Sequence, residues 1–125
     1  MQTVYSKSYT LRTESGQWLG QVVLTSDGMF ASVTDYGNLS YCWRHTGSSD
    51  FREFICDLNT GYFGTKLYTG MSYIAFSKKI EKACDRFAVK ILPPLQKILK
   101  EELANGIGWL SSEQEAQERD ATKMP

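Results

Sequence analysis

The sequence predicts an α+β fold, in which a four-stranded antiparallel meander is followed by a short helix and a long Pro-kinked helical segment packed on one sheet face. Apolar and polar residues alternate with a period of two over the first 45 residues, and Gly-bearing turns separate the alternating runs. From about residue 73 a helical spacing of apolar residues replaces the alternation. We expect a single α+β domain over residues 1–110 and a loosely ordered polar C-terminal tail over residues 111–125.

Four strands are expected, at residues 5–11, 18–24, 29–33 and 39–43. In the second strand, Trp18 is expected to share a face with Val22 and Leu24, while Leu19 and Val23 take the other face. The connections between the strands are short and rich in Gly, Asn, Asp and Ser, so neighbouring strands run antiparallel. Helices cover one face of this sheet, and the other face is expected to remain exposed.

Two helical segments are expected after the sheet. Asp50, with Glu53 three residues later, is typical of a capping box that opens a short helix, and residues 59–61 are expected to end it. Residues 62–70 are aromatic and punctuated by glycine, which favours a surface loop or a short extra strand. Residues 73–104 have a helical period, and Pro93 and Pro94 are expected to kink this segment or to break it into two helices.

Composition and charge exclude several classes of protein. The 14 Lys+Arg and 14 Asp+Glu residues give a net charge of zero, which excludes a wholly basic nucleic-acid coat and an acidic tail protein. The N-terminus has no signal-peptide pattern, and the longest uncharged run is far shorter than the ~20 residues that span a bilayer. Cys42, Cys56 and Cys84 lack metal-ligand spacing and are expected to be reduced packing residues. We therefore expect a cytoplasmic protein with no membrane partner.

Motifs for catalysis are missing from the sequence. His45 is the single histidine, so any Ser–His or Cys–His pair must use it, and a His metal cluster is excluded. Phosphate-binding loops, dinucleotide-binding glycine motifs and nucleophile elbows do not occur, and no short motif pairs two carboxylates. We expect a protein that is not an enzyme and that uses no metal and no cofactor.

A basic row on the second helical segment is the first candidate binding surface. Residues 76–104 carry seven positive and four negative side chains, a surplus of three, whereas residues 1–75 carry −1 and residues 105–125 carry −2. A spacing of four places most of these cations along one side of the helix, bordered by one more lysine; the row consists of Lys78, Lys79, Lys82, Arg86 and Lys90. The row is either a solvated face softened by Glu81 and Asp85, a phosphate-binding surface or a contact for an acidic protein.

Aromatic residues beside predicted turns form the second candidate binding surface. Rigid amphipathic rings supply interface area at a low entropy cost, although any one of them can instead be a core residue. The flanking glycines at 61 and 64 favour projecting rings in the segment between them. The candidates are Tyr36, Tyr62, Phe63 and Tyr68.

Residues 35–43, 51–55 and 62–67 carry a pattern of aromatic and glycine residues that resembles small accessory proteins encoded by bacteriophages and prophages. The resemblance covers about a third of the chain. It implies a compact phage protein that binds and redirects a host protein, including host defence machinery such as CRISPR effectors.

Together these observations favour a non-enzymatic phage accessory protein. Its expected partner is a bacterial host protein or protein–nucleic acid complex, and its expected action is inhibition of a CRISPR-type defence complex or another nucleic-acid-processing complex. The alternative is direct nucleic-acid binding through the basic helix face, and the oligomeric state stays open.

Overall fold

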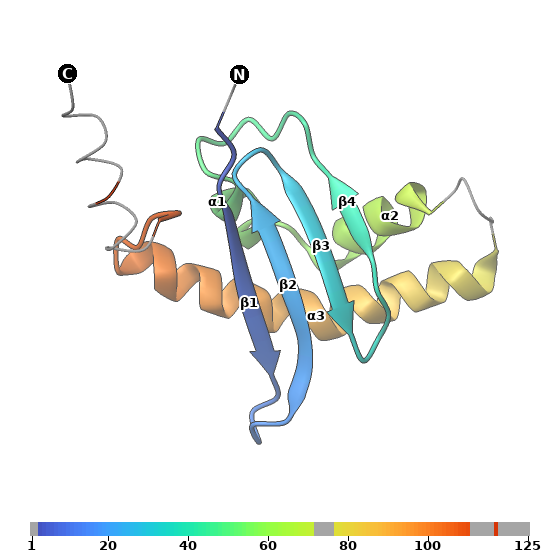
Figure 1. The fold of residues 1–125 in the computed structure, drawn as a ribbon. Coiled ribbons are helices and arrows are strands. Elements are labelled where there is room, and N and C mark those ends of the chain that lie inside the picture. The colour runs from blue at the N-terminus through green and yellow to red at the C-terminus, as the bar shows by residue number, and fades with distance from the viewer. Residues whose placement is uncertain (1–2, 72–76, 111–116, 118–125) are drawn as a thin grey trace.

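A four-stranded antiparallel sheet forms the first half of the protein, as the sequence predicts. The computed structural model describes residues 3–71, 77–110 and 117. The strands are β1 (Ser6–Arg12), β2 (Trp18–Thr25), β3 (Met29–Thr34) and β4 (Ser40–Cys42), and they lie in the order β1-β2-β3-β4. Figure 1 shows the β1–β2 and β3–β4 turns at the same end of the sheet. This arrangement brings the two hairpin tips close to one stretch of the last helix.

Within the described residues, three helices follow the sheet and cover one of its faces (Figure 1). They are α1 (Phe51–Cys56), α2 (Thr60–Gly70) and α3 (Lys78–Ala104), and α3 crosses behind the strands and extends past the sheet at both ends. Residues 72–76 and 111–116 lie outside the described residues, as do residues 118–125. The expected helical start near residue 73 and nearly all of the expected polar tail therefore fall outside the described part of the chain.

The core lies between the sheet and the helices. Phe30 of β3, Phe63 of α2 and Phe87 of α3 are fully buried, and their ring centroids lie 5.1–6.4 Å apart. Trp43, which follows β4, stacks on Phe63 with a centroid distance of 6.0 Å. The sheet, α2 and α3 thus each contribute at least one large aromatic ring to a single cluster, and packing within this cluster fixes the position of α2 and α3 under the sheet.

The register of the first hairpin changes which side of β2 is buried. An irregularity between Leu11 and Arg12 pairs Leu11 with Gly20 and Arg12 with Trp18, so that Leu19 has no partner on β1. Trp18 is 42% exposed and Leu19 is 8% exposed, so the expected faces of these two residues are wrong. Val22 and Leu24, beyond the irregularity, are buried as expected.

The prediction of a loop or an extra strand at residues 62–70 is wrong, because this segment is helix α2. Asn59 was expected to help end the preceding helix; instead its side chain accepts a hydrogen bond from the Tyr62 amide and caps the start of α2. Gly64 faces α3, where a Cβ would lie 2.9 Å from an Asp85 carboxylate oxygen. Glycine therefore serves here as a site of close helix packing, and the segment does not need a glycine-specific loop conformation.

Helix α3 is continuous through Pro93 and Pro94, so the expected break into two helices does not occur. Each proline removes one backbone donor. Their neighbours Leu92 and Leu95 are fully buried, whereas Pro93 is exposed. Packing of the flanking leucines therefore holds the helix together across the missing hydrogen bonds, and the helix ends at Ala104, as expected.

Candidate functional site

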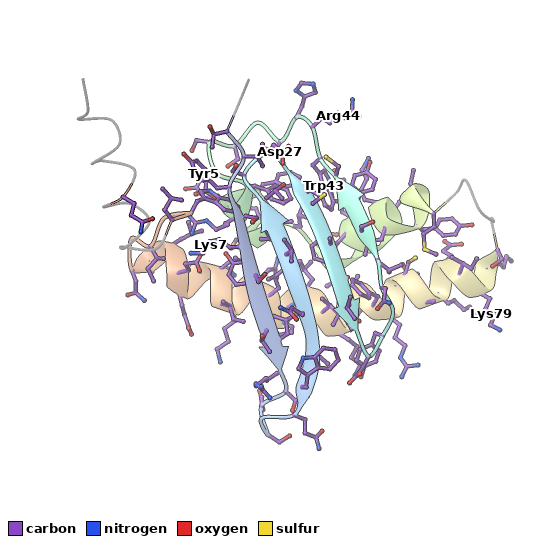
Figure 2. The ribbon with its side chains drawn as sticks, viewed as in Figure 1. Tyr5, Lys7, Asp27, Trp43, Arg44 and Lys79 are labelled. Carbon is purple, nitrogen blue, oxygen red and sulfur yellow. The ribbon has the colours of Figure 1, made fainter. Side chains whose placement is uncertain are left out.

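The basic row lies along one side of α3 and is exposed to solvent. Ser77 caps the helix by accepting a hydrogen bond from the Ile80 amide at 3.1 Å. The apolar stripe of the helix faces the core. Each residue turns the helix by about 100°, so cations three or four residues apart lie together on a side of the helix that is not part of this stripe. We call this side the cationic flank; it consists of Lys79, Lys82, Arg86, Lys90 and Lys97. Figure 2 shows Lys79 near the start of α3, with its side chain pointing away from the sheet.

Glu81 and Asp85 lie on another side of α3 from most of the cationic flank. Asp85 faces Gly64 of α2, and Glu81 is one turn earlier on the same side as Asp85. Lys78 is exposed and lies one turn before Lys82, so it borders the flank on the side of these carboxylates. Within the described residues, ion pairs involve Lys7 and Arg52, and no carboxylate lies within ion-pair distance of the cationic flank. The flank cations therefore form no direct ion pair in this part of the chain, although Glu101 lies one turn after Lys97 on the same side of the helix.

Tyr36, on the turn between β3 and β4, joins the cationic flank. The Arg86 guanidinium carbon lies 5.2 Å from the centre of the Tyr36 ring, and the Lys90 amine lies 6.0 Å from it. These distances are typical of cation–π contacts. The ring is half-buried and packs on the core. The structure thus brings together one of the predicted aromatic residues and two members of the predicted basic row.

The other three aromatic candidates have different environments. Phe63 is fully buried in the core, so its expected projection from a loop is wrong. Tyr62 is 39% exposed, and the Lys66 amine lies 5.5 Å from its ring centre. Tyr68 is half-buried and packs on the core. The four candidates do not form one aromatic surface.

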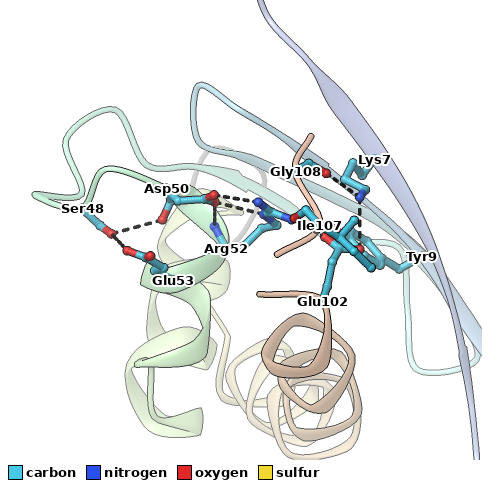
Figure 3. A network of polar contacts seen from close by, with 9 residues as sticks. All are labelled: Lys7, Tyr9, Ser48, Asp50, Arg52, Glu53, Glu102, Ile107 and Gly108. Carbon is cyan, nitrogen blue, oxygen red and sulfur yellow. Dashed lines mark hydrogen bonds and ion pairs between the residues drawn. The ribbon is translucent and has the colours of Figure 1, made fainter. Parts of the chain in front are cut away.

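A polar network centred on Arg52 lies at the far end of α3 and was not predicted (Figure 3). The guanidinium of Arg52, which is 3% exposed, donates to both carboxylate oxygens of Asp50 and to Glu102. It also donates to the Ile107 carbonyl at 2.8 Å. Glu102 accepts a hydrogen bond from the Tyr9 hydroxyl at 2.8 Å and pairs with Lys7 at 3.2 Å. The network joins β1, α1 and the C-terminal end of α3.

Proton affinities in this network follow from its burial and its charges. Burial and the neighbouring Glu102 carboxylate raise the pKa of Tyr9 well above its ordinary value of 10.0. Burial opposes ionisation of Asp50, but hydrogen bonds and charge from Arg52 outweigh it and lower the pKa of Asp50 below 3.8. Burial likewise disfavours the charged form of Arg52, yet Asp50 and Glu102 raise its pKa. The network therefore holds Asp50 and Arg52 in their ionised forms.

Asp50 is the N-cap of α1 as predicted, although the reciprocal contact of a capping box does not form. The Asp50 side chain accepts a hydrogen bond from the Arg52 amide at 2.9 Å. The Glu53 carboxylate accepts a hydrogen bond from the Ser48 hydroxyl at 3.3 Å. The sequence signal for a cap was therefore correct, and the cap also orients Asp50 toward the guanidinium of the same helix.

The remaining candidate residues are dispersed. His45 is exposed on the loop after β4. Cys84 is buried and Cys56 is half-buried, and burial raises the pKa of both thiols. Cys42 is exposed on β4, so its expected role in packing is wrong. In the described ranges, no group of three or more His, Cys, Asp and Glu side chains is placed to hold a metal ion. Nor do these ranges contain a helix with the length and apolar character needed to cross a bilayer.

The fold and the site define an α+β protein whose sheet is covered on one face by helices and whose longest helix presents an exposed cationic flank. The chain belongs to a phage family, because the model of that family matches residues 1–83, about two thirds of the sequence. The matched stretch includes the sheet, α1, α2 and the first part of the flank. No curated protein and no solved structure matches the chain. The resemblance to phage-encoded proteins is thus confirmed.

Proposed function

We propose that this phage protein acts in the host cytoplasm by binding a bacterial protein through the cationic flank, and that it does so without catalysing a reaction. Its target is an acidic surface of a host defence complex, such as a CRISPR-type complex, or of another nucleic-acid-processing complex. Membership of a phage family supports the setting, because phage genes are expressed inside an infected bacterium.

The observation that carries the proposal is a row of exposed cations without carboxylate partners in the described structure. From Lys79 to Lys97 the flank extends about 27 Å along the helix at 1.5 Å per residue. Lys79, Lys82 and Arg86 give the N-terminal part of the flank a surplus of positive charge, which accelerates encounter with an acidic partner and orients the two surfaces. The side chains of Arg86 and Lys90 already contact the face of the Tyr36 ring, so less side-chain entropy is lost when a partner binds them.

The environment of the aromatic residues favours a protein partner over a single-stranded nucleic acid. Proteins that bind single strands stack the bases on free aromatic rings. Tyr36 packs on the core and lies beside Arg86 and Lys90, and Phe63 is inaccessible. The flank therefore offers charge without a free stacking platform beside it.

Affinity capture from lysates of plausible bacterial hosts tests the proposal. The wild-type protein is compared with a flank-reversed variant, Lys82→Glu with Arg86→Glu, and with a control variant, Arg44→Glu with Lys100→Glu. Both variants change the net charge equally and replace exposed residues; the control residues lie beyond the stretch from Lys79 to Lys97, because Arg44 follows β4 and Lys100 lies about five turns after Lys82. We expect a stoichiometric host protein with the wild type and the control, and its loss with the flank-reversed variant. Circular dichroism verifies that all three are folded; equal capture by all three refutes the proposal.

Binding of duplex nucleic acid is the second candidate function, and the length of the flank favours it. Phosphate contacts release counterions, so affinity falls steeply as salt rises. A mobility-shift titration with a 30-base-pair duplex at low and at physiological salt separates the two functions. A salt-sensitive shift that the flank-reversed variant abolishes supports nucleic-acid binding, and the lack of a shift at low salt excludes it.

A further inference from the structure

Two hollows adjoin along the cationic flank and meet at Tyr36. The first, of about 390 Å³, lies between the N-terminal half of α3 and the β3–β4 turn, and is lined by Asp35, Tyr36, Lys79, Lys82, Ala83 and Arg86. The second, of about 840 Å³, continues toward the C-terminal half of α3 and reaches the β1–β2 hairpin. Because Tyr36 lines both hollows, they are neighbours between the helix and the two hairpin tips, and we call the two together the groove.

The chemistry of the groove changes along its length. The first hollow has three cations, at Lys79, Lys82 and Arg86, and a single carboxylate, at Asp35. The second hollow has a mixed lining, in which cations and carboxylates surround apolar side chains; the apolar members are Leu19, Pro93, Pro94 and Ile98, and the cations are Arg12, Lys90 and Lys97. A ligand that complements both hollows carries negative charge at one end and apolar groups at the other.

We infer that the groove holds an extended segment of the partner protein, with acidic residues on the first hollow and apolar residues on the second. The inference rests on the proposed function and specifies its partner. From Lys79 to Ile98 the groove covers about 28 Å of helix, which corresponds to eight or nine residues of extended chain at about 3.3 Å each.

The lining of the groove disfavours a nucleic acid or a second copy of this chain as its occupant. A nucleic acid carries phosphates along its whole length, whereas the second hollow offers apolar side chains and the carboxylates of Glu14 and Glu101. A second copy of this chain in a symmetric contact places one cationic flank against the other, and like charges repel. A mixed acidic and apolar segment meets neither obstacle.

Fluorescence anisotropy with two synthetic peptides tests the inference. One peptide has a glutamate-rich half and a leucine-rich half; the other has the same number of glutamates, with serine in place of leucine. Burying even one leucine side chain is worth more than a factor of ten in affinity, so we expect the mixed peptide to bind at least about tenfold more tightly. Equal affinities for the two peptides overturn the inference, as does tighter binding of a DNA oligonucleotide at the same salt.

A pair of matched variants locates the binding. Lys97→Glu changes a residue that lines the second hollow, and Lys100→Glu makes the same charge change on an exposed residue outside it. We expect Lys97→Glu to weaken binding of the mixed peptide and Lys100→Glu to leave it within about twofold of the wild type. Equal effects of the two changes overturn the inference.

Failure of the inference and failure of the proposed function give different results. If the flank-reversed variant loses its host protein but the mixed peptide shows no preference for the groove, the proposed function stands and the inference is wrong. If the flank-reversed variant keeps its host protein, the proposed function fails whatever the peptides do.

Discussion

Replacing Arg52 by alanine is expected to destabilise the fold strongly, because the guanidinium is the centre of a buried charge network. It makes four hydrogen bonds, to Asp50, Glu102 and the Ile107 carbonyl, and is 3% exposed. Removing one partner of a buried ion pair costs about 3–5 kcal/mol. Glu102 keeps Lys7 and Tyr9 as partners, which places the expected loss near the lower end, at about 3 kcal/mol.

Urea unfolding followed by circular dichroism measures this loss. Arg44→Ala, which removes an exposed guanidinium from the loop after β4, serves as the control and is expected to change the free energy of unfolding by less than about 0.5 kcal/mol. Replacing Arg52 and Glu102 together by methionine is expected to cost less than the sum of the two single changes, because no charge is left unpaired between them. A cost below about 1 kcal/mol for Arg52→Ala would refute the reasoning.

The network also predicts how the free energy of unfolding changes as the pH falls. Because Arg52 lowers the pKa of Asp50 in the folded state, the stabilisation is present above the ordinary value of 3.8 and is lost as pH falls through the folded pKa. In Arg52→Ala the lowering of this pKa disappears. Acid titrations are therefore expected to show a shallower loss of stability below pH 4 in the variant than in the wild type.

Three further changes test the core and the network by urea unfolding. The raised pKa of Tyr9 keeps its hydroxyl protonated in the folded state while the unfolded chain ionises above 10.0, so the wild type loses stability as pH rises past that value and Tyr9→Phe loses less. Gly64→Val is expected to cost about 1–3 kcal/mol by crowding α3, whereas Gly61→Val, near the exposed start of α2, changes stability by less than about 0.5 kcal/mol. Phe63→Ala is expected to cost about 3–5 kcal/mol and Tyr62→Ala about 1 kcal/mol or less, and equal losses at the two positions contradict the buried placement of Phe63.

The sheet could be predicted from the sequence because burial on one side forces the side chains to alternate. Helix α2 could not, because its local signals point elsewhere. Its glycines weaken helix propensity, and Asn59 is as typical of a helix end as of a helix start. What stabilises α2 is tertiary: Phe63 and Leu67 enter the core, and Gly64 lets α3 approach. The formation of α2 therefore depends on packing contacts that exist only in the folded protein, and these contacts outweigh the weak helix propensity of the segment.

The candidate site also has one part that could be predicted from the sequence and one part that could not. The cationic flank lies on one helix, so its geometry follows from a spacing of three and four residues. Its contact with Tyr36 joins positions far apart in the sequence, as does the pairing of Arg52 with Glu102. A strand turn and a helix flank meet only after the sheet docks on α3, and no pattern within either segment carries that information.

The two groups of charges on α3 have different physical roles. Glu102, near its C-terminal end, is half-buried and pairs with the buried Arg52 of α1; leaving either charge unpaired is costly, so the fold provides a partner for each. The flank cations are exposed, and ion pairs at exposed positions contribute about 0–1 kcal/mol, so folding gains little by neutralising them. Reversing Lys82 and Arg86 should consequently leave the free energy of unfolding nearly unchanged while altering the field that an acidic partner meets. Stability and binding are therefore separable on this helix, and a loss of binding in the flank-reversed variant reports on the surface itself.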